Sequence, residues 1–317
     1  MGFSTADWLV VAAYLVIVVA VGIVAGRPRR ASSATSDEAF LASRSMPSWA
    51  VAISVVATSL SAATFIGGPQ QAYVGDLTYF STNLGGILAV LIVAFWFIPA
   101  FYRAGVTSIY ELLGARWGPS PRRAASAMFM LGRVFASGAR LFMVAIPFAL
   151  VAFGETNAPS LIAAIVIIAI AATVYTSIGG MRAVIWTDVL QAVVVVVTAG
   201  LALIILVQRI PAPLADVVAA LDQSEKLRLF DTSLAVDRPF TIWTATTGFV
   251  LFLVAAYGTD QDLAQRTLTC RTSRQGSWSM ILSQIVSWPV LLIFLALGLG
   301  LHVLYERPDL MGGTALP

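Results

Sequence analysis

The stretch SWAVAISVVATSLSAATFIGGPQQAY, residues 48–73, decides the fold. It is long enough to cross a bilayer, because a spanning helix needs about 20 predominantly apolar residues. Its middle carries hydroxyl side chains, followed by the breaker cluster Gly67-Gly68-Pro69. Three consecutive breakers predict unwound backbone at mid-membrane, which is tolerated only where it is buried or lines a cavity. The stretch therefore predicts a broken helix beside a polar site; close packing of helices through small residues is the alternative interpretation.

Apolar blocks of similar length recur along the whole chain. Hydrophobic residues make up 59% of the 317 residues and charged residues only 11%, against roughly a quarter charged in soluble domains. We expect eight spans, at 6–26, 48–73, 77–102, 124–153, 159–178, 184–207, 240–258 and 277–305. The chain is therefore predicted to be an all-α integral membrane protein whose surroundings are the lipid bilayer. Residues 214–230 are expected to form a short amphipathic surface helix, with a solvated loop as the alternative.

The basic residues predict the orientation of these spans. If the N-terminus lies outside, most of the 19 basic residues fall in inside loops, as the positive-inside rule requires. They are Arg27, Arg29, Arg30, Arg44, Arg103, Arg116, Arg122, Arg123, Arg182, Arg266, Arg271 and Arg274. The net charge of +3 therefore reflects membrane orientation and does not indicate a nucleic-acid partner. Residues 1–7 lack the basic start of a signal peptide. We expect a multi-pass plasma-membrane protein.

Several classes of chemistry are excluded by what the sequence lacks. Cys270 is the single cysteine, which excludes an intrachain disulfide and a multi-cysteine metal site. His302 is the single histidine and lies at the end of an apolar block, where an interfacial role is expected. The chain has no phosphate-binding loop, so it is not an ATP-driven pump. It also shows no nucleophile–base pair, and we expect neither an enzyme nor an organic cofactor.

Four motifs follow one another along the chain. They are FLASR at 40–44, ATSLSAATFIGG at 57–68, GGMRAVIWTDVLQ at 179–191 and DQDLAQR at 260–266. In identity and order they resemble the sodium:solute symporter family, whose members carry sugars, proline, monocarboxylates or sialic acid. The resemblance covers nearly the whole chain and is specific to the family rather than to one solute.

The resemblance implies a LeuT-like fold, in which two inverted five-helix repeats meet at a midplane site. Residues 1–30 would form a leading transmembrane helix and 48–207 the first repeat. Residues 240–317 would begin the second repeat, so the bundle is expected to be truncated after about eight helices. In the family the sodium site takes hydroxyl ligands from a later helix, and we expect that this chain alone does not complete it.

The resemblance also implies the sodium ligands. The backbone carbonyls of Ala57 and Leu60 would bind the ion from the broken helix, and Asp188 would lie on the sodium path. Helix capping is the alternative role for Asp188, because it lies near the start of a predicted span.

Solute contacts would come from the hydroxyl groups at the break and from the next span. By resemblance they are Ser59, Ser61, Thr64 and Asn83, with helix packing and capping as the alternative. Such groups orient a polar solute in an otherwise apolar pocket.

Two arginines occur inside one predicted span. An arginine at mid-membrane costs about 3 kcal/mol or more and normally faces the interior with a partner. Arg140 lies in a stretch similar to that of the family's carboxylate carriers, and its guanidinium suits a carboxylate; a structural ion pair is the alternative. Arg133 is expected to snorkel toward the inside surface. We expect Asp260 and Gln261 to tie an inside loop, and Gln284 to face the cavity.

These observations predict a sodium-coupled secondary transporter, a symporter that carries a small polar, carboxylate-bearing solute by alternating access. Sodium would be the coupling ion. Two alternatives stay open: a membrane-embedded sensory input domain of a signalling protein, and an inactive truncated fragment. The sequence leaves the solute, the sodium stoichiometry and the oligomeric state open.

Overall fold

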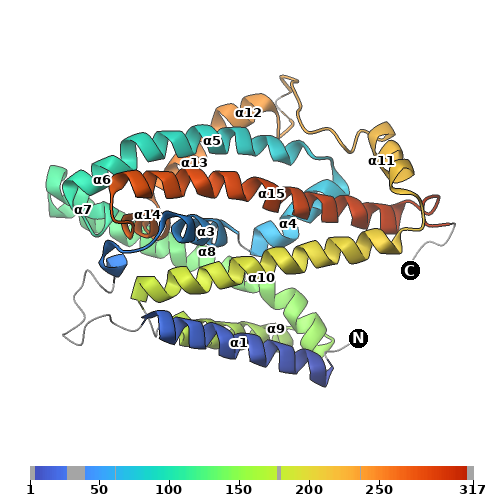
Figure 1. Cartoon of the computed structure of the whole chain (residues 1–317), viewed down its shortest axis with the longest axis horizontal. Helices are drawn as coiled ribbons and strands as arrows, with labels where there is room; N and C mark the ends of the chain where they lie inside the picture. The colour runs from blue at the N-terminus through green and yellow to red at the C-terminus, as the bar shows by residue number, and fades with distance from the viewer. Residues whose placement is uncertain (1–3, 27–39, 61, 177–179, 236, 313–317) are drawn as a thin grey trace.

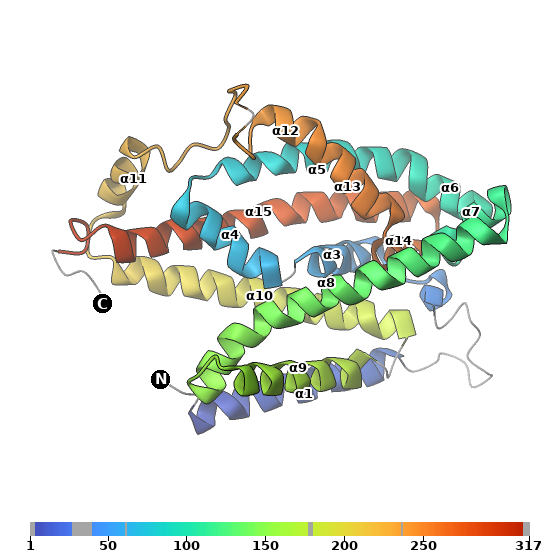
Figure 2. The ribbon, with the colours of Figure 1, turned by 180° about the vertical axis from the view of Figure 1, so that it is seen from behind.

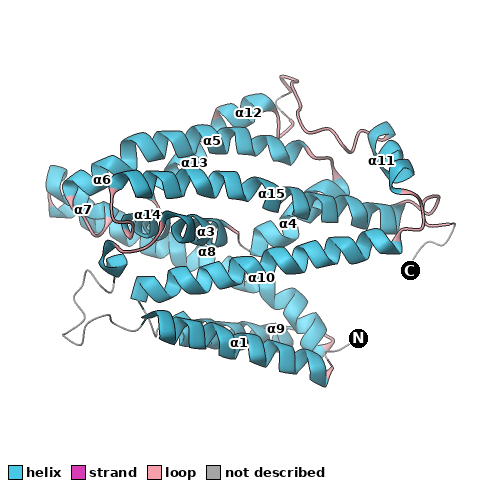
Figure 3. Cartoon of the chain, in the orientation of Figure 1, coloured by secondary structure: helices cyan, strands magenta, loops and turns pink. Residues whose placement is uncertain are grey.

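The computed structural model describes residues 4–26, 40–60, 62–176, 180–235 and 237–312, and within them the regular elements are helices. The helices are α1 (Thr5–Gly26), η1 (Ala42–Arg44), α3 (Ser48–Ser59), α4 (Ala62–Val74), η2 (Thr78–Ser81), α5 (Thr82–Ile92), η3 (Val93–Phe97), α6 (Ile98–Ala104), α7 (Ile109–Trp117), α8 (Pro119–Phe153), α9 (Ala158–Thr176), α10 (Gly180–Arg209), α11 (Leu214–Gln223), α12 (Ile242–Thr246), α13 (Gly248–Thr259), α14 (Gln261–Leu268) and α15 (Ser273–Glu306). The prediction of an all-α protein is confirmed (Figure 3).

Each of the eight predicted spans corresponds to helical structure. Six helical segments are long and apolar enough to cross a membrane: Thr5–Gly26, Thr78–Ala104, Pro119–Phe153, Gly180–Arg209, Ile242–Thr259 and Ser273–Glu306. The bent pair α3 and α4 gives a seventh span. The eighth predicted span, 159–178, corresponds to α9, a shorter apolar helix.

The long helices run side by side as a bundle (Figures 1 and 2). In its centre α15 contacts α3, α4, α5 and α10, while α1 packs against α9 and α10. The start of α1, the end of α15 and α11 lie at one end of the bundle, which we name the α11 end. The turns around α6, α7 and α14 lie at the opposite end, named the α14 end. Arg44, Arg103 and Arg116 belong to elements at the α14 end, in agreement with the predicted alternation of loops; which end faces the cytoplasm stays a prediction.

The predicted helix break exists, but at another residue. α3 ends at Ser59, Leu60 adopts an extended conformation, and the segments Ser48–Ser59 and Thr64–Val74 are bent by 64°. The predicted breaker cluster Gly67-Gly68-Pro69 lies inside α4 instead, so its assignment as the break is wrong.

Close packing explains why that cluster stays helical. A Cβ on Gly68 would lie 3.4 Å from the Cβ of Phe294, and a Cβ on Gly298 would lie 2.1 Å from the carbonyl oxygen of Pro69. Small residues on both helices therefore let α4 and α15 approach backbone to backbone. The alternative interpretation, packing through small residues, holds for this cluster.

The predicted amphipathic helix within 214–230 is confirmed as α11. Its apolar residues Val217 and Leu221 are buried against Ala72 of α4 and Leu295 and Leu299 of α15. Its exposed residues include Asp216, Asp222 and Gln223, together with the apolar Leu214 and Val218. The segment between α10 and α12 thus covers α4 at the α11 end of the bundle.

Candidate functional site

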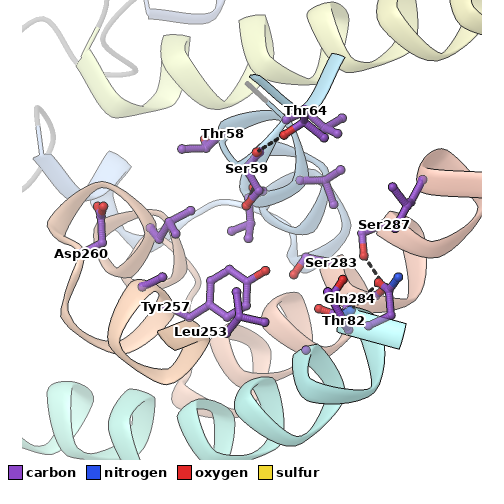
Figure 4. Close-up of a pocket in the computed structure, with 18 of the residues that line it drawn as sticks. Thr58, Ser59, Thr64, Thr82, Leu253, Tyr257, Asp260, Ser283, Gln284 and Ser287 are labelled. Carbon is purple, nitrogen blue, oxygen red and sulfur yellow. Dashed lines mark hydrogen bonds between the residues drawn. The ribbon is translucent and has the colours of Figure 1, made fainter. Parts of the chain in front are cut away.

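A polar cavity of about 370 Å³ lies beside the break between α3 and α4 (Figure 4). Residues from α4, η2, α5, α8, α13, α14 and α15 complete its wall. Its polar lining residues are Thr58, Ser59, Thr64, Tyr79, Thr82, Asn83, Arg133, Arg140, Tyr257, Asp260, Ser283, Gln284 and Ser287. Five spans distant in sequence therefore present polar groups to one space within an apolar bundle.

Four of the predicted solute-binding residues line this cavity together: Ser59, Thr64, Asn83 and Arg140. The fifth, Ser61, lies outside the described residues. The Ser59 hydroxyl donates to the carbonyl of Val55 at 2.9 Å, and Thr64 Oγ1 donates to the carbonyl of Ser59 at 3.5 Å. Such hydroxyl-to-backbone bonds compete with helical ones. The local sequence therefore favours an ending of α3 at this point. The solute role of these residues stays a prediction.

The end of α3 supplies the predicted sodium ligands. The last carbonyl groups of a helix have no partner within it, and the last turn of α3 includes Ala57. Leu60, the next residue after the helix, lines the cavity, whereas Ala57 is not among the lining residues. Oxygen atoms are the ligands that hard cations prefer. The arrangement is compatible with cation binding, and the role of the two carbonyls stays a prediction.

Two buried amides on facing helices form a hydrogen bond in the cavity wall. Gln284 Nε2 of α15 donates to Asn83 Oδ1 of α5 at 3.1 Å, and Asn83 Nδ2 donates to the carbonyl of Phe80 at 3.1 Å. Gly86 lies against the Gln284 amide, which a Cβ on Gly86 would approach to 2.6 Å. The predicted orientation of Gln284 toward the cavity is confirmed.

Arg133 lines the cavity and has two acidic partners. Its Nη1 lies 3.4 Å from Asp260 Oδ2, and its Nη2 also contacts Asp262. The guanidinium is therefore held by two carboxylates at the start of α14, and its snorkelling toward the inside surface stays a prediction. Asp260 caps α14 by accepting from the Asp262 amide at 2.8 Å, and in addition it lines the cavity.

The prediction that Gln261 ties a loop is confirmed. Its Oε1 accepts from the Ile109 amide at 3.0 Å and from Ser108 Oγ at 3.3 Å. The amide thus ties the start of α14 to the start of α7.

Asp188 does not cap a helix. α10 begins at Gly180, two turns before it, so the capping interpretation is wrong. Its Oδ2 accepts from Ser54 Oγ at 2.5 Å and from Arg266 at 3.2 Å (Nε) and 3.1 Å (Nη2). This network joins α3, α10 and α14, and the Asp188 side chain is only 15% exposed. Asp188 is not among the residues that line the cavity, and its sodium role stays a prediction.

Some residues of the cavity wall were not predicted from the sequence. Ser279, Ser283 and Ser287 recur every fourth residue of α15, and the last two line the cavity. This spacing places them on one helix face and could have revealed them. Tyr79 and Tyr257 have no comparable signal, because each is one aromatic residue among several in its span.

A broken helix beside a polar cavity, in an all-helical bundle of membrane-spanning length, is an arrangement typical of multi-pass secondary transporters. The chain belongs to the sodium:solute symporter family, whose model matches residues 39–314.

Relatives of known function agree with this membership. The chain is 28% identical over 307 residues to sodium-coupled monocarboxylate transporter 2 of Danio rerio, covering 97% of the chain and 48% of the relative. It is 27% identical to the human sodium/iodide cotransporter, with 99% and 48% covered. It is 29% identical to the sodium/sialic acid symporter NanT of Aliivibrio fischeri, with 98% and 60% covered.

A solved structure shows the same fold. A substrate-bound, outward-open sodium-coupled sialic acid symporter superposes with a TM-score of 0.82 at 27% identity, covering 97% of this chain and 62% of that chain. The chain therefore has the expected LeuT-like fold. It spans about half the length of the monocarboxylate and iodide transporters that it matches.

Proposed function

We propose that the protein carrying this chain is a sodium-coupled symporter of the plasma membrane that moves a small polar solute by alternating access. The observation that carries the proposal is the polar cavity beside the break at Leu60, bounded by spans from distant parts of the chain. Residues 48–207 act as the first repeat and 240–317 as the start of the second, with 1–30 as a leading helix and the N-terminus outside. The Ala57 and Leu60 carbonyls, with Asp188 on the ion path, serve sodium.

The solute bears a carboxylate. Arg140 lines the cavity, and among the described residues no carboxylate forms an ion pair with it. A guanidinium offers two parallel N–H groups to a planar anion. Ser59, Thr64 and Asn83 supply further donors and acceptors for the rest of the solute. The names of the monocarboxylate and sialic acid relatives support this class.

Uptake into proteoliposomes tests the proposal. Purified protein is reconstituted, and accumulation of labelled monocarboxylates, sialic acid, proline, iodide and glucose is measured under an inward sodium gradient and under an equal potassium gradient. We expect accumulation of a carboxylate only with sodium. Arg122 lies on α8 like Arg140, but it is not among the residues that line the cavity and pairs with Glu111 of α7. It provides the control variant Arg122→Gln, which should transport normally. Accumulation that is equal in sodium and potassium would contradict the proposal.

A further inference from the structure

Lys226 is a buried lysine in the loop that follows α11. It is only 9% exposed. Its Nζ donates to the carbonyl oxygens of Gly75 at 2.8 Å, Tyr73 at 2.9 Å and Ala72 at 3.5 Å. All three belong to the last turn of α4 or to the residue just after it. A loop far away in sequence thus places a cation on the end of the outer half of the broken helix.

The physical chemistry of a helix end explains this contact. The last four carbonyl groups of a helix lack partners within it and carry partial negative charge. An ammonium group has three donors in a compact head, which matches three converging carbonyls. Among the described residues no carboxylate lies within ion-pair distance of Lys226. The helix end therefore helps to compensate the cost of burying this charge, together with the nearby carboxylates of Asp76 and Glu306.

Further contacts hold the same end of α4. Arg228, two residues after Lys226, donates to Asp76 Oδ2 through Nε at 3.3 Å and Nη2 at 3.0 Å. On the other side, the Tyr73 hydroxyl donates to Glu306 Oε1 at 2.8 Å, which joins α4 to the end of α15. These contacts are partly exposed, and exposed pairs contribute little. Lys226 is the buried member of the set.

We propose that Lys226 is a positioning residue that fixes the outer half of the broken helix relative to the cavity. The inference rests on the proposed function, because its consequence is solute affinity. Thr64 lines the cavity near the start of α4, whereas Lys226 holds the other end. A helix of this length is stiff and rises 1.5 Å per residue. A displacement at Gly75 therefore moves Thr64, about 16 Å away along the axis.

Hydrogen–deuterium exchange tests whether Lys226 holds the end of α4, without any transport measurement. In detergent, Lys226→Met should accelerate amide exchange in α4 and leave α13 and α15 at wild-type rates. Lys226→Arg keeps the charge and the donors, so its exchange rate in α4 should lie between those of the wild type and the Met variant. The control is Arg307→Gln at the same end of the bundle, which breaks the exposed pair with Asp309 and should leave α4 unchanged. Unchanged exchange in α4 of the Met variant would overturn the proposal, as would acceleration throughout the bundle.

Solute uptake tests whether Lys226 affects the affinity for the solute. Lys226→Met should raise the solute concentration for half-maximal uptake about tenfold, equivalent to about 1.4 kcal/mol, with little change in the maximal rate at saturation. A lower maximal rate at unchanged half-saturation would contradict a positioning role. If the Met variant does not fold, Lys226→Gln replaces it, because the amide keeps an N–H donor, and a smaller shift in the same direction is expected. If the wild type shows no sodium-driven uptake, the proposed function fails. The exchange experiment still decides whether Lys226 holds the end of α4.

Discussion

Arg133 and Arg140 lie two turns apart on one face of α8 and line the same cavity, yet their partners differ. Arg133 is held by Asp260 and Asp262 at the start of α14. For Arg140 the described residues provide no ion pair, and the side chain is exposed toward the cavity. One arginine is therefore part of the protein's own charge network, and the other is available to a ligand.

Replacing Arg140 should weaken carboxylate binding. A hydrogen bond to a charged group contributes about 1.5–3 kcal/mol, so Arg140→Ala should raise the half-saturating concentration about tenfold to a hundredfold. Arg140→Lys should also weaken binding, because an ammonium keeps the charge but loses the planar fork. Uptake of acids and sugars is compared among the variants, with Arg122→Lys as a control. Preferred transport of a neutral sugar, with wild-type affinity in both variants, would show that Arg140 is structural.

A methyl group on Gly86 should separate the two buried amides. The Cβ of Gly86→Ala would lie 2.6 Å from Gln284 Nε2, and the long Gln284 side chain can move away. Asn83 then loses its donor, and a buried unpaired acceptor costs about 1–3 kcal/mol. We expect weaker solute binding together with a lower unfolding temperature. Gly138→Ala on α8 is the matched control, because no atom lies within 4 Å of its Cβ. Equal effects of the two substitutions would argue against the amide pair.

The orientation of the bundle can be measured with cysteines. Ser120 is exposed at the start of α8, at the α14 end, and Ser224 is exposed just after α11. An impermeant thiol reagent applied to intact cells should label Ser224→Cys and leave Ser120→Cys and Ser273→Cys unlabelled. In inverted vesicles the pattern should reverse. Labelling of Ser120→Cys from outside would mean that the assigned orientation is wrong.

The native cysteine should not disturb such experiments. Burial raises the pKa of the Cys270 thiol to about 11, and the thiolate is the reactive form. Near pH 7.5 the folded protein should therefore resist maleimide, whereas the denatured protein should react fully. The measurement is the mass shift before and after denaturation. Rapid labelling of the folded wild type would show that Cys270 is accessible.

The sequence predicted the order of the helical segments well, because apolar length is a local property that the bilayer imposes on each helix. Among the described residues, up to seven of the eight predicted spans have membrane-spanning length, and α9 is shorter. The prediction failed at the position of the break. Gly67, Gly68 and Pro69 favour unwinding locally, but they lie inside α4. Phe294 packs against Gly68 and Gly298 against Pro69, so that α15 holds this part of α4 helical. That contact joins residues more than two hundred positions apart, and no local pattern contains it.

The residues of the candidate site were also predicted only in part. The hydroxyl residues Ser59 and Thr64, and Arg140, were predicted, because polar residues are conspicuous in an apolar span. The partners of Arg133 and Asp188 were not, since they depend on where the short helix α14 lies. Asp262 and Arg266 occupy neighbouring turns of that helix and reach α8 and α10, respectively. Only the folded chain brings these charges together.

The contact between Gly298 and Pro69 limits the degrees of freedom of the broken helix. With the carbonyl of Pro69 set directly against the backbone of α15, α4 cannot rotate about its own axis without a collision at Gly298. Any rearrangement of the cavity must then move α4 and α15 together as one rigid unit. The joint that remains is Leu60, where the chain is extended between α3 and α4.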